Sequence, residues 1–394
     1  MSLSKSPQRE IVRALPITIS VLFLFFCLLF WNKESINGAK IGLTFCSEML
    51  IPSMFPFMVL SAFVVKSGLS RRMSGILGVL TKTLFGLPGC TGATILIGLI
   101  GGYPAGARGI KALWERGEIS QNHAERMLYF VVGAGPAFVI SVVGLGLLRN
   151  YQIGLILFIS QLISSIFIGM LLKFDKKDHE NQIYAVTLKK SSNKNSLSDA
   201  LVESCADSTG AMLSMCSLVV LFCSLWGVIK NTVFESMAVD FFTNIRLSDG
   251  ISKSIFPVLL EVTIGCRDCV SFGASYTLLA FALGWAGICV HFQIYTSVGD
   301  MKFSKIKFIS IRLLHGILAA LIFSIFLKIY PATVAVSSLN CINCDRLPIN
   351  AYSFTSGSLA LILLCACFLS TLTPKIINLK ESDSKMRKIS EPKT

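Results

Sequence analysis

Long apolar runs alternate with short polar segments along this chain of 394 residues. An α-helix rises about 1.5 Å per residue, so about 20 apolar residues cross the roughly 30 Å hydrocarbon core of a bilayer. Eight runs come close to or exceed this length: 15–31, 42–65, 127–148, 151–173, 207–229, 276–297, 309–330 and 354–373. We therefore predict an all-α multi-pass membrane protein with about eight transmembrane helices.

Two further segments, 88–117 and 253–274, are apolar but interrupted by glycine, proline or charged residues. The interruptions include Pro88, Gly101, Gly102 and Pro104 in the first segment and Glu261, Arg267 and Asp268 in the second. Irregular backbone survives at membrane depth only where protein groups or a water-filled cavity satisfy its hydrogen bonds. We interpret both segments as re-entrant hairpins, the first entering from the cytoplasm and the second from outside, with a cavity between them.

The charged residues support a membrane protein and set its orientation. Hydrophobic residues make up 53% of the chain and charged residues 15%, whereas soluble proteins average about 25% charged. The net charge of +14 comes from lysines and arginines between the apolar runs, not from a basic face that would bind nucleic acid. With the eight helices above, all five basic segments fall on one side, which predicts that both termini are cytoplasmic. These segments are 1–14, 66–82, 173–200, 298–312 and 374–394.

The two interrupted segments occupy corresponding places, which predicts an internal repeat. Each precedes a helix broken by glycine, at 133–138 and at 284–288, and an odd number of crossings separates the copies. Inverted repeats with broken segments near the midplane are typical of secondary transporters. The expected organisation is an N-terminal helix and loop (1–40), a first repeat (41–173), a cytoplasmic linker (174–206), a second repeat (207–330) and a C-terminal helix with a basic tail (331–394).

The first hairpin and its broken helix offer backbone groups to a solute. Gly102 and Gly106 have the G-x-x-x-G spacing of close helix packing, but Pro104 breaks the helical hydrogen bonds, and we favour a hairpin tip that includes Tyr103. Gly135 and Pro136 either kink a helix or begin a half-helix. In the second case its positive N-terminus would suit a carboxylate or a phosphate.

The second hairpin carries the most informative charge. A carboxylate at mid-bilayer costs roughly 2.5–3.5 kcal/mol on insertion scales, so Glu261 is expected to couple transport to H⁺ or Na⁺, to pair with Arg267, or to reach water at a shallower depth. We place Gly265, Arg267 and Asp268 at the tip, where Arg267 holds an anion or forms an internal salt bridge.

Two further candidates lie on the broken helix of the second half. His291 and Gln293 are the strongly polar side chains of the run 276–297. They either contact the solute or form hydrogen bonds between helices.

Other chemistry has weak signals. The thirteen cysteines are scattered, and the C-x-x-C pairs Cys266/Cys269 and Cys341/Cys344 lack a second pair or histidine, so we predict no metal site and leave open a disulfide in the second pair. Cys90 facing the first pair would make a soft-metal site, which keeps a metal-ion carrier as an alternative. No nucleotide-binding or hydrolase motif is present, so we expect neither an enzyme nor a cofactor.

Several motifs together resemble a known family, over about residues 40–330. They are PSMFPF (52–57), GGYPAGA (101–107), GEIS (117–120), AER (124–126), GPAF (135–138), LEVTIG (260–265) and GICVHFQ (287–293). These resemble the sporulation integral membrane protein YlbJ family, also called stage V sporulation protein V, of the nucleoside-recognition (Gate) domain group. Related proteins often have Asn before the Gly-Pro where this chain has Gly133 and Ala134, which favours backbone contacts there.

The resemblance implies a fold similar to concentrative nucleoside transporters, built from two Gate-like repeats. It also implies export of dipicolinic acid from the mother cell across the outer forespore membrane during sporulation. The expected partners are a small anionic solute, the lipid bilayer and a coupling ion (H⁺ or Na⁺), with homo-oligomers left open. The alternatives are a nucleoside or metal-ion transporter in the cell membrane, and a membrane scaffold for spore maturation that transports nothing.

Overall fold

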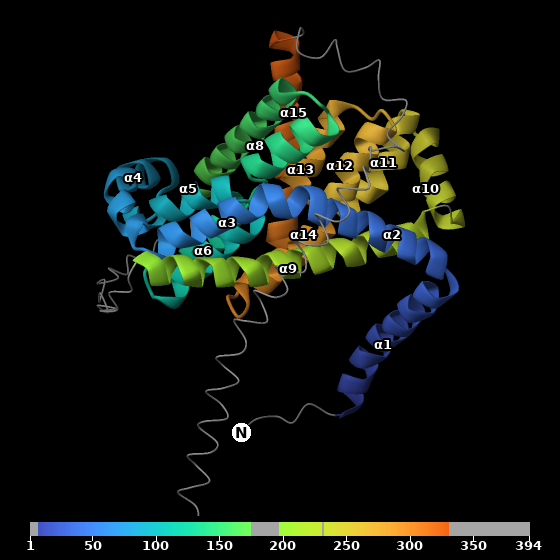
Figure 1. Ribbon diagram of the computed structural model, residues 1–394, viewed down its shortest axis with the longest axis horizontal. Helices are drawn as coiled ribbons and strands as arrows, with labels where there is room; N and C mark the ends of the chain where they lie inside the picture. The colour runs from blue at the N-terminus through green and yellow to red at the C-terminus, as the bar shows by residue number, and fades with distance from the viewer. Residues whose placement is uncertain (1–6, 175–196, 231, 331–394) are drawn as a thin grey trace, which may run out of the picture.

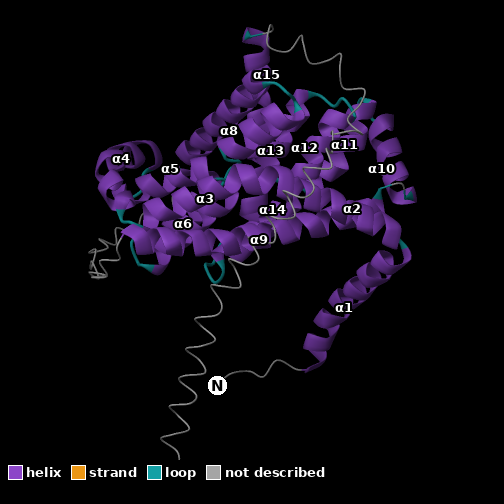
Figure 2. Ribbon diagram, viewed as in Figure 1, coloured by secondary structure: helices purple, strands orange, loops and turns teal. Residues whose placement is uncertain are grey.

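The computed structural model describes residues 7–174, 197–230 and 232–330, and every regular element in these ranges is helical (Figure 2). Outside the described residues lie the predicted helix 354–373, the basic tail, Cys341 and Cys344. Residues 175–196 of the predicted linker also lie outside them. The N-terminal part begins with α1 (Pro7–Phe30), α2 (Asn32–Phe45), the π-helical turn η1 (Cys46–Leu50) and α3 (Ile51–Lys66).

Five described helical stretches are long and apolar enough to cross a membrane. They are Asn32–Lys66, Tyr151–Leu172, Leu197–Ile229, Tyr276–Val298 and Lys305–Ile329. The pair Leu77–Phe85 and Gly89–Gly101, bent by 109°, would make a sixth if it is one broken span. The chain is therefore a multi-pass α-helical membrane protein, as the apolar runs predicted.

The first half continues with a string of shorter helices. These are α4 (Leu69–Phe85), η2 (Gly89–Thr91), α5 (Gly92–Gly101), α6 (Tyr103–Glu115), α7 (Gln121–Val131), the π-helix η3 (Ala137–Leu147) and α8 (Tyr151–Leu172). The basic stretch 66–82, predicted as a loop, is mostly the helix α4. The predicted helix 127–148 is broken between α7 and η3, because Pro136 lacks the N–H that would continue the helical hydrogen bonds.

The second half follows the same order of elements. It contains α9 (Leu197–Ile229), α10 (Val233–Asn244), α11 (Asp249–Leu260), α12 (Val262–Ser271), α13 (Tyr276–Trp285), α14 (Gly287–Val298) and α15 (Lys305–Ile329). The predicted helix 276–297 is broken at Ala286, which has a left-handed φ of 73°. Each half thus contains two short helices joined by a turn, followed by a second broken helix.

Two long helices, α2 and α9, run side by side across the molecule (Figure 1). Glycines make this contact close: a Cβ atom added to Gly42 would lie 2.9 Å from Cys223 Cβ, and one added to Gly38 would lie 3.0 Å from Ser224 Cα. Backbone therefore meets backbone along this pair. By contrast, α1 projects away from the body of the molecule in Figure 1.

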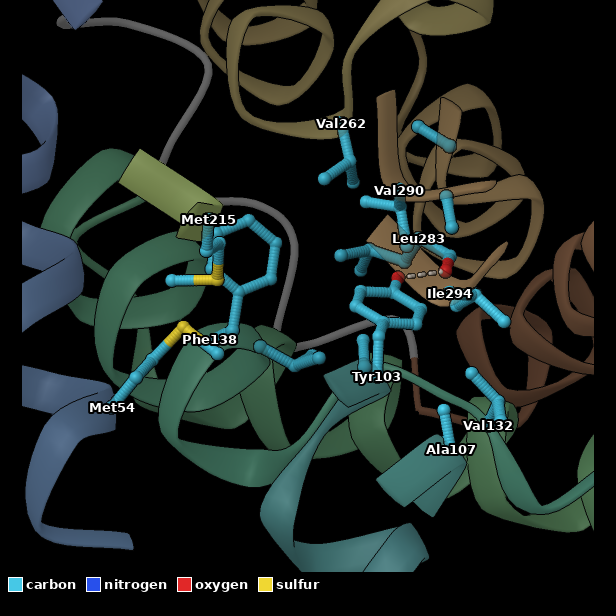
Figure 3. Packing of buried hydrophobic residues seen from close by; sticks show 14 of the residues in the cluster. Met54, Tyr103, Ala107, Val132, Phe138, Met215, Val262, Leu283, Val290 and Ile294 are labelled. Carbon is cyan, nitrogen blue, oxygen red and sulfur yellow. Dashed lines mark hydrogen bonds between the residues drawn. The ribbon is translucent and has the colours of Figure 1, made fainter. Parts of the chain in front are cut away.

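The buried core joins both halves (Figure 3). Its side chains come from α3, α6 and η3 of the first half and from α9, α12, α13 and α14 of the second half, and include Met54, Tyr103, Phe138, Met215, Val262, Leu283 and Val290. The helix turns described below lie in this region.

Candidate functional site

The turn between α5 and α6 lies at Gly102, inside the protein. Gly102 has φ 83° and ψ −178°, a conformation that is essentially restricted to glycine. It packs against the broken helix of its own half, since a Cβ on Gly135 would lie 2.7 Å from Ile100 O and 3.0 Å from Gly102 N. The predicted residues Gly102 and Gly135 are therefore neighbours.

The turn between α11 and α12 lies at Glu261, which is 1% exposed. Glu261 has an extended backbone and caps α12, because its Oε2 accepts a hydrogen bond of 2.8 Å from the Ile264 amide. Its Oε1 atom has no hydrogen-bond partner of standard geometry among the described residues. A Cβ added to Gly287 would lie 2.9 Å from Glu261 Cα, so this turn also packs against the break in its own half.

Tyr103 connects the first turn to the second half. Its hydroxyl donates a hydrogen bond of 2.7 Å to Leu283 O in the last turn of α13 (Figure 3). The ring lies against the guanidinium of Arg312, with 5.9 Å from Cζ to the ring centroid. Tyr103 also interacts electrostatically with Glu261, so residues of both turns share one neighbourhood.

Arg312, on α15, holds the ends of both broken helices and is fully buried. One terminal nitrogen donates to Val132 O, at 2.6 Å, just after α7 ends, and the other donates to Gly284 O near the end of α13. The terminal carbonyls of a helix carry partial negative charge, which stabilises a cation placed there. A single side chain thus completes the hydrogen bonding of one half-helix from each half.

The broken helix of the second half is further fixed by aromatic residues. Trp285 Nε1 donates to Leu259 O at 3.1 Å, which ties the break at Ala286 to the end of α11. His291 Nε2 lies 3.0 Å from Trp285 O, and its ring packs edge-on against Trp285 and Phe308. The predicted solute ligand His291 therefore forms an interhelical contact in this structure.

Arg267 and Asp268 do not lie at the tip, and that prediction is wrong. The turn is at Glu261, and both residues lie beyond the first turn of α12. Arg267 pairs with Asp268 at 3.2 Å, and the other oxygen of Asp268 accepts from Trp226 Nε1 at 3.2 Å. Arg267 does not pair with Glu261. Gly265 is a packing residue, since a Cβ there would lie 2.6 Å from Val258 Cα.

The remaining predicted residues are close to the turns. Pro104 and Gly106 are buried in the first two turns of α6, and a Cβ on Gly106 would lie 3.2 Å from Gly98 Cα on α5. Pro136 is half-buried at the start of η3. Gln293 is buried on α14 and its amide lies 3.5 Å from Cys289 Sγ. No group of three or more His, Cys, Asp or Glu side chains in the described ranges is placed to hold a metal ion.

Comparison with known proteins finds one similar sequence of known name. No family model and no solved structure matches the chain. The sporulation integral membrane protein YlbJ of Bacillus subtilis (strain 168) is 24% identical over 400 residues, which cover 93% of this chain and 96% of the relative. The chain is therefore similar to a sporulation membrane protein over almost its whole length. The match covers almost the whole length, so it includes both turns and both broken helices.

Sequence reasoning missed Arg312 and a polar cluster beside it. The sequence pattern places Arg312 in the basic segment 298–312, because it stands close to Lys305 and Lys307 at the start of an apolar run. In the structure it lies inside α15. His315, one turn further, approaches Gln161 O at 3.1 Å and Ser165 Oγ at 3.4 Å on α8. The available signal was the spacing of Arg312 and His315 within an apolar run, because intramembrane polar residues at helical spacing indicate a partnered face.

Proposed function

We propose that this chain is a membrane transporter for a small organic anion. The observation that supports it most is the pair of buried turns, Gly102 and Glu261, one in each half. Each packs against the break in a second helix, and Tyr103, directly after the first turn, donates a hydrogen bond to Leu283 O in the second half. A buried turn in a multi-pass protein places irregular backbone where a solute can be bound away from lipid.

The order of elements supports an inverted repeat. In each half a short helix (α4 or α10) precedes a helix–turn–helix unit (α5/α6 or α11/α12), then a broken helix (α7/η3 or α13/α14), then a long apolar helix (α8 or α15). We propose that the helix–turn–helix units are re-entrant hairpins and that the two halves are Gate-like repeats of opposite orientation. With 15–31 and 354–373 counted as spans, this topology has eight crossings.

The helix ends favour an anion over a cation. Carbonyls near the C-terminal ends of α7, α11 and α13 already accept hydrogen bonds from Arg312, Trp285 and Tyr103. In contrast, α6, η3 and α14 begin without a side-chain cap. Uncapped N-termini offer N–H groups and positive dipole character, which suit a carboxylate.

The family supports a role in sporulation, and dipicolinate is the substrate we propose. Dipicolinate is a dianion at neutral pH, so its two carboxylates match two half-helix N-termini. We propose that the protein acts in the outer forespore membrane, with both termini in the cytoplasm of the mother cell. Glu261, the buried carboxylate at the second turn whose Oε1 atom has no hydrogen-bond partner among the described residues, is our candidate for coupling to H⁺ or Na⁺.

The proposal is tested by uptake into proteoliposomes that contain the purified chain. We expect labelled dipicolinate to enter at a rate well above that of protein-free liposomes, and uridine and Fe²⁺ to enter at the background rate. Uptake of uridine or Fe²⁺ alone would replace dipicolinate with a nucleoside or a metal ion. Uptake of none of the three by a correctly folded protein would support a membrane scaffold instead.

Coupling is tested with Glu261→Gln, which keeps the shape of the side chain and removes its charge. We expect the variant to lose accumulation driven by an imposed H⁺ or Na⁺ gradient, because a neutral amide does not exchange a proton near neutral pH and holds a cation more weakly than a carboxylate. Glu115→Gln, at an exposed glutamate on α6, is the matched control and should accumulate solute normally. Gradient-driven accumulation by the Glu261 variant at the normal level would exclude the coupling role.

A further inference from the structure

The charge of Arg312 has no carboxylate partner within the described ranges. Its side chain is fully buried, and the ion pairs among the described residues involve other cations, such as Lys66 and Arg267. Its hydrogen bonds go to two neutral carbonyls, Val132 O and Gly284 O, and its Nε atom has no partner. A guanidinium stays protonated in proteins, so a full positive charge remains at the centre of the molecule.

Burial of an uncompensated charge is costly, and intramembrane charges are therefore retained chiefly where they serve a function. The two carbonyls offset part of this cost through the partial negative charge of helix C-termini. They do not cancel a unit charge. The electrostatic partner given for Arg312 is Tyr103, and Tyr103 in turn interacts with Glu261.

Arg312 is placed so that the positive charge of its guanidinium acts on the region of the two turns. The Tyr103 ring lies over the guanidinium, and Tyr103 is the first residue of α6, directly after the turn at Gly102. An electrostatic effect persists over such a distance because the surroundings are apolar and exclude water. A solute held at Gly102 and Glu261 would therefore feel this charge without contacting it.

We propose that Arg312 determines the preference for anions, by acting through its charge rather than as a ligand. This inference rests on the proposed transport function. It replaces Arg267, whose guanidinium is already paired with Asp268, as the source of positive charge for the solute. At a separation of about 12 Å and an effective dielectric constant of about 20, one unit charge on the solute corresponds to roughly a tenfold change in affinity.

The test compares three ligands of similar shape and different charge. Binding of dipicolinate (a dianion), picolinate (a monoanion) and the neutral pyridine-2,6-dicarboxamide is measured by titration calorimetry with the full-length protein in detergent. Two variants separate charge from geometry: Arg312→Lys keeps the charge and loses the double hydrogen bond, whereas Arg312→Gln loses the charge. Arg116→Gln, an exposed arginine beside Glu118, is the matched control.

We expect Arg312→Gln to lose about tenfold or more of the preference for dipicolinate over the neutral diamide, and Arg312→Lys to keep most of it while transport slows. A folded Arg312→Gln protein with an unchanged preference would overturn the inference. Equal loss in both variants would also overturn it, because only geometry would then matter.

The wild-type protein provides a second measurement if the variants do not fold. We expect its affinity to rise by about tenfold with each negative charge on the ligand, and equal affinities for the three ligands would contradict the inference. Failure of the proposed function is recognised separately. A wild-type protein that takes up uridine and does not bind dipicolinate would remove the anion transporter, whatever the Arg312 variants do.

Discussion

Ala286 and Gly287 take two successive left-handed conformations, with φ values of 73° and 76°. Only glycine adopts this region freely, so Ala286 is strained by about 1–2 kcal/mol. Gly287 has a second constraint, since a Cβ there would lie 2.9 Å from Glu261 Cα and 3.0 Å from Glu261 N. A methyl group is therefore tolerated at position 286 but meets backbone atoms at position 287.

We expect Gly287→Ala to lower the midpoint of thermal unfolding in detergent by several degrees and to impair solute uptake, because the added methyl group meets backbone and moves Glu261. Ala286→Gly is the matched change in the opposite direction. It should stay within about 1 kcal/mol of the wild type, since relief of strain offsets the entropy cost of glycine. Similar losses in both variants would show that the break tolerates no change, whatever its contacts.

Glycine contacts also hold each helix–turn–helix unit closed. Gly106 on α6 meets Gly98 on α5, where an added Cβ would lie 3.2 Å from Gly98 Cα and 3.2 Å from Val131 O. In the second half, Gly265 on α12 meets Val258 Cα on α11. Each unit is thus closed by a glycine in its second helix, although the two turns themselves differ.

Gly106→Ala is expected to destabilise the protein by about 1–3 kcal/mol, because all its near neighbours are backbone atoms. Gly109→Ala, one turn further on α6, meets the methyl group of Thr94 at 3.0 Å, which can shift, and should cost less. Thermal unfolding of both variants in detergent provides the measurement. A larger loss for Gly109→Ala would contradict the packing described for α5 and α6.

The sequence predicted the first turn and the two breaks, because each contains a glycine or proline that excludes continuous helix. It did not predict the turn at Glu261, since there the chain turns at a carboxylate that caps the next helix, and the nearby Gly265 drew the prediction four residues too far. Arg312 was missed for another reason. Its partners, Val132 and Gly284, are brought together only by the folded chain.

At the scale of the whole molecule, contacts between polar groups bring several basic segments of the chain close to one another. Lys66 pairs with Glu203 at 3.0 Å and with Asp207 at 2.6 Å, Arg108 donates to Asp207 O, and Lys173 donates to Thr83 O. At the other basic loop, Ser304 N donates to Glu125 at 3.0 Å. That the basic segments face the cytoplasm stays a prediction from their charge.

Orientation is tested by labelling introduced cysteines with a membrane-impermeant maleimide. We expect Asp300→Cys to react from the cytoplasmic side and Asp249→Cys from the opposite side, because both positions are exposed at opposite ends of the predicted topology. The native cysteines are first replaced by alanine, since Cys27, Cys90 and Cys205 are partly exposed and would add background reaction. Labelling of both sites from one side would refute the proposed topology.

The close contact of α2 with α9 has a mechanical consequence. Because their backbones touch at Gly38 and Gly42, neither helix can slide or rotate along the other without first separating. A carrier that works by displacement needs one part that stays still against the lipid and one part that travels. If the chain is such a carrier, we expect the α2–α9 pair to be the fixed part. The helices α7, α13 and α15, which Arg312 links by hydrogen bonds, would then move together relative to it.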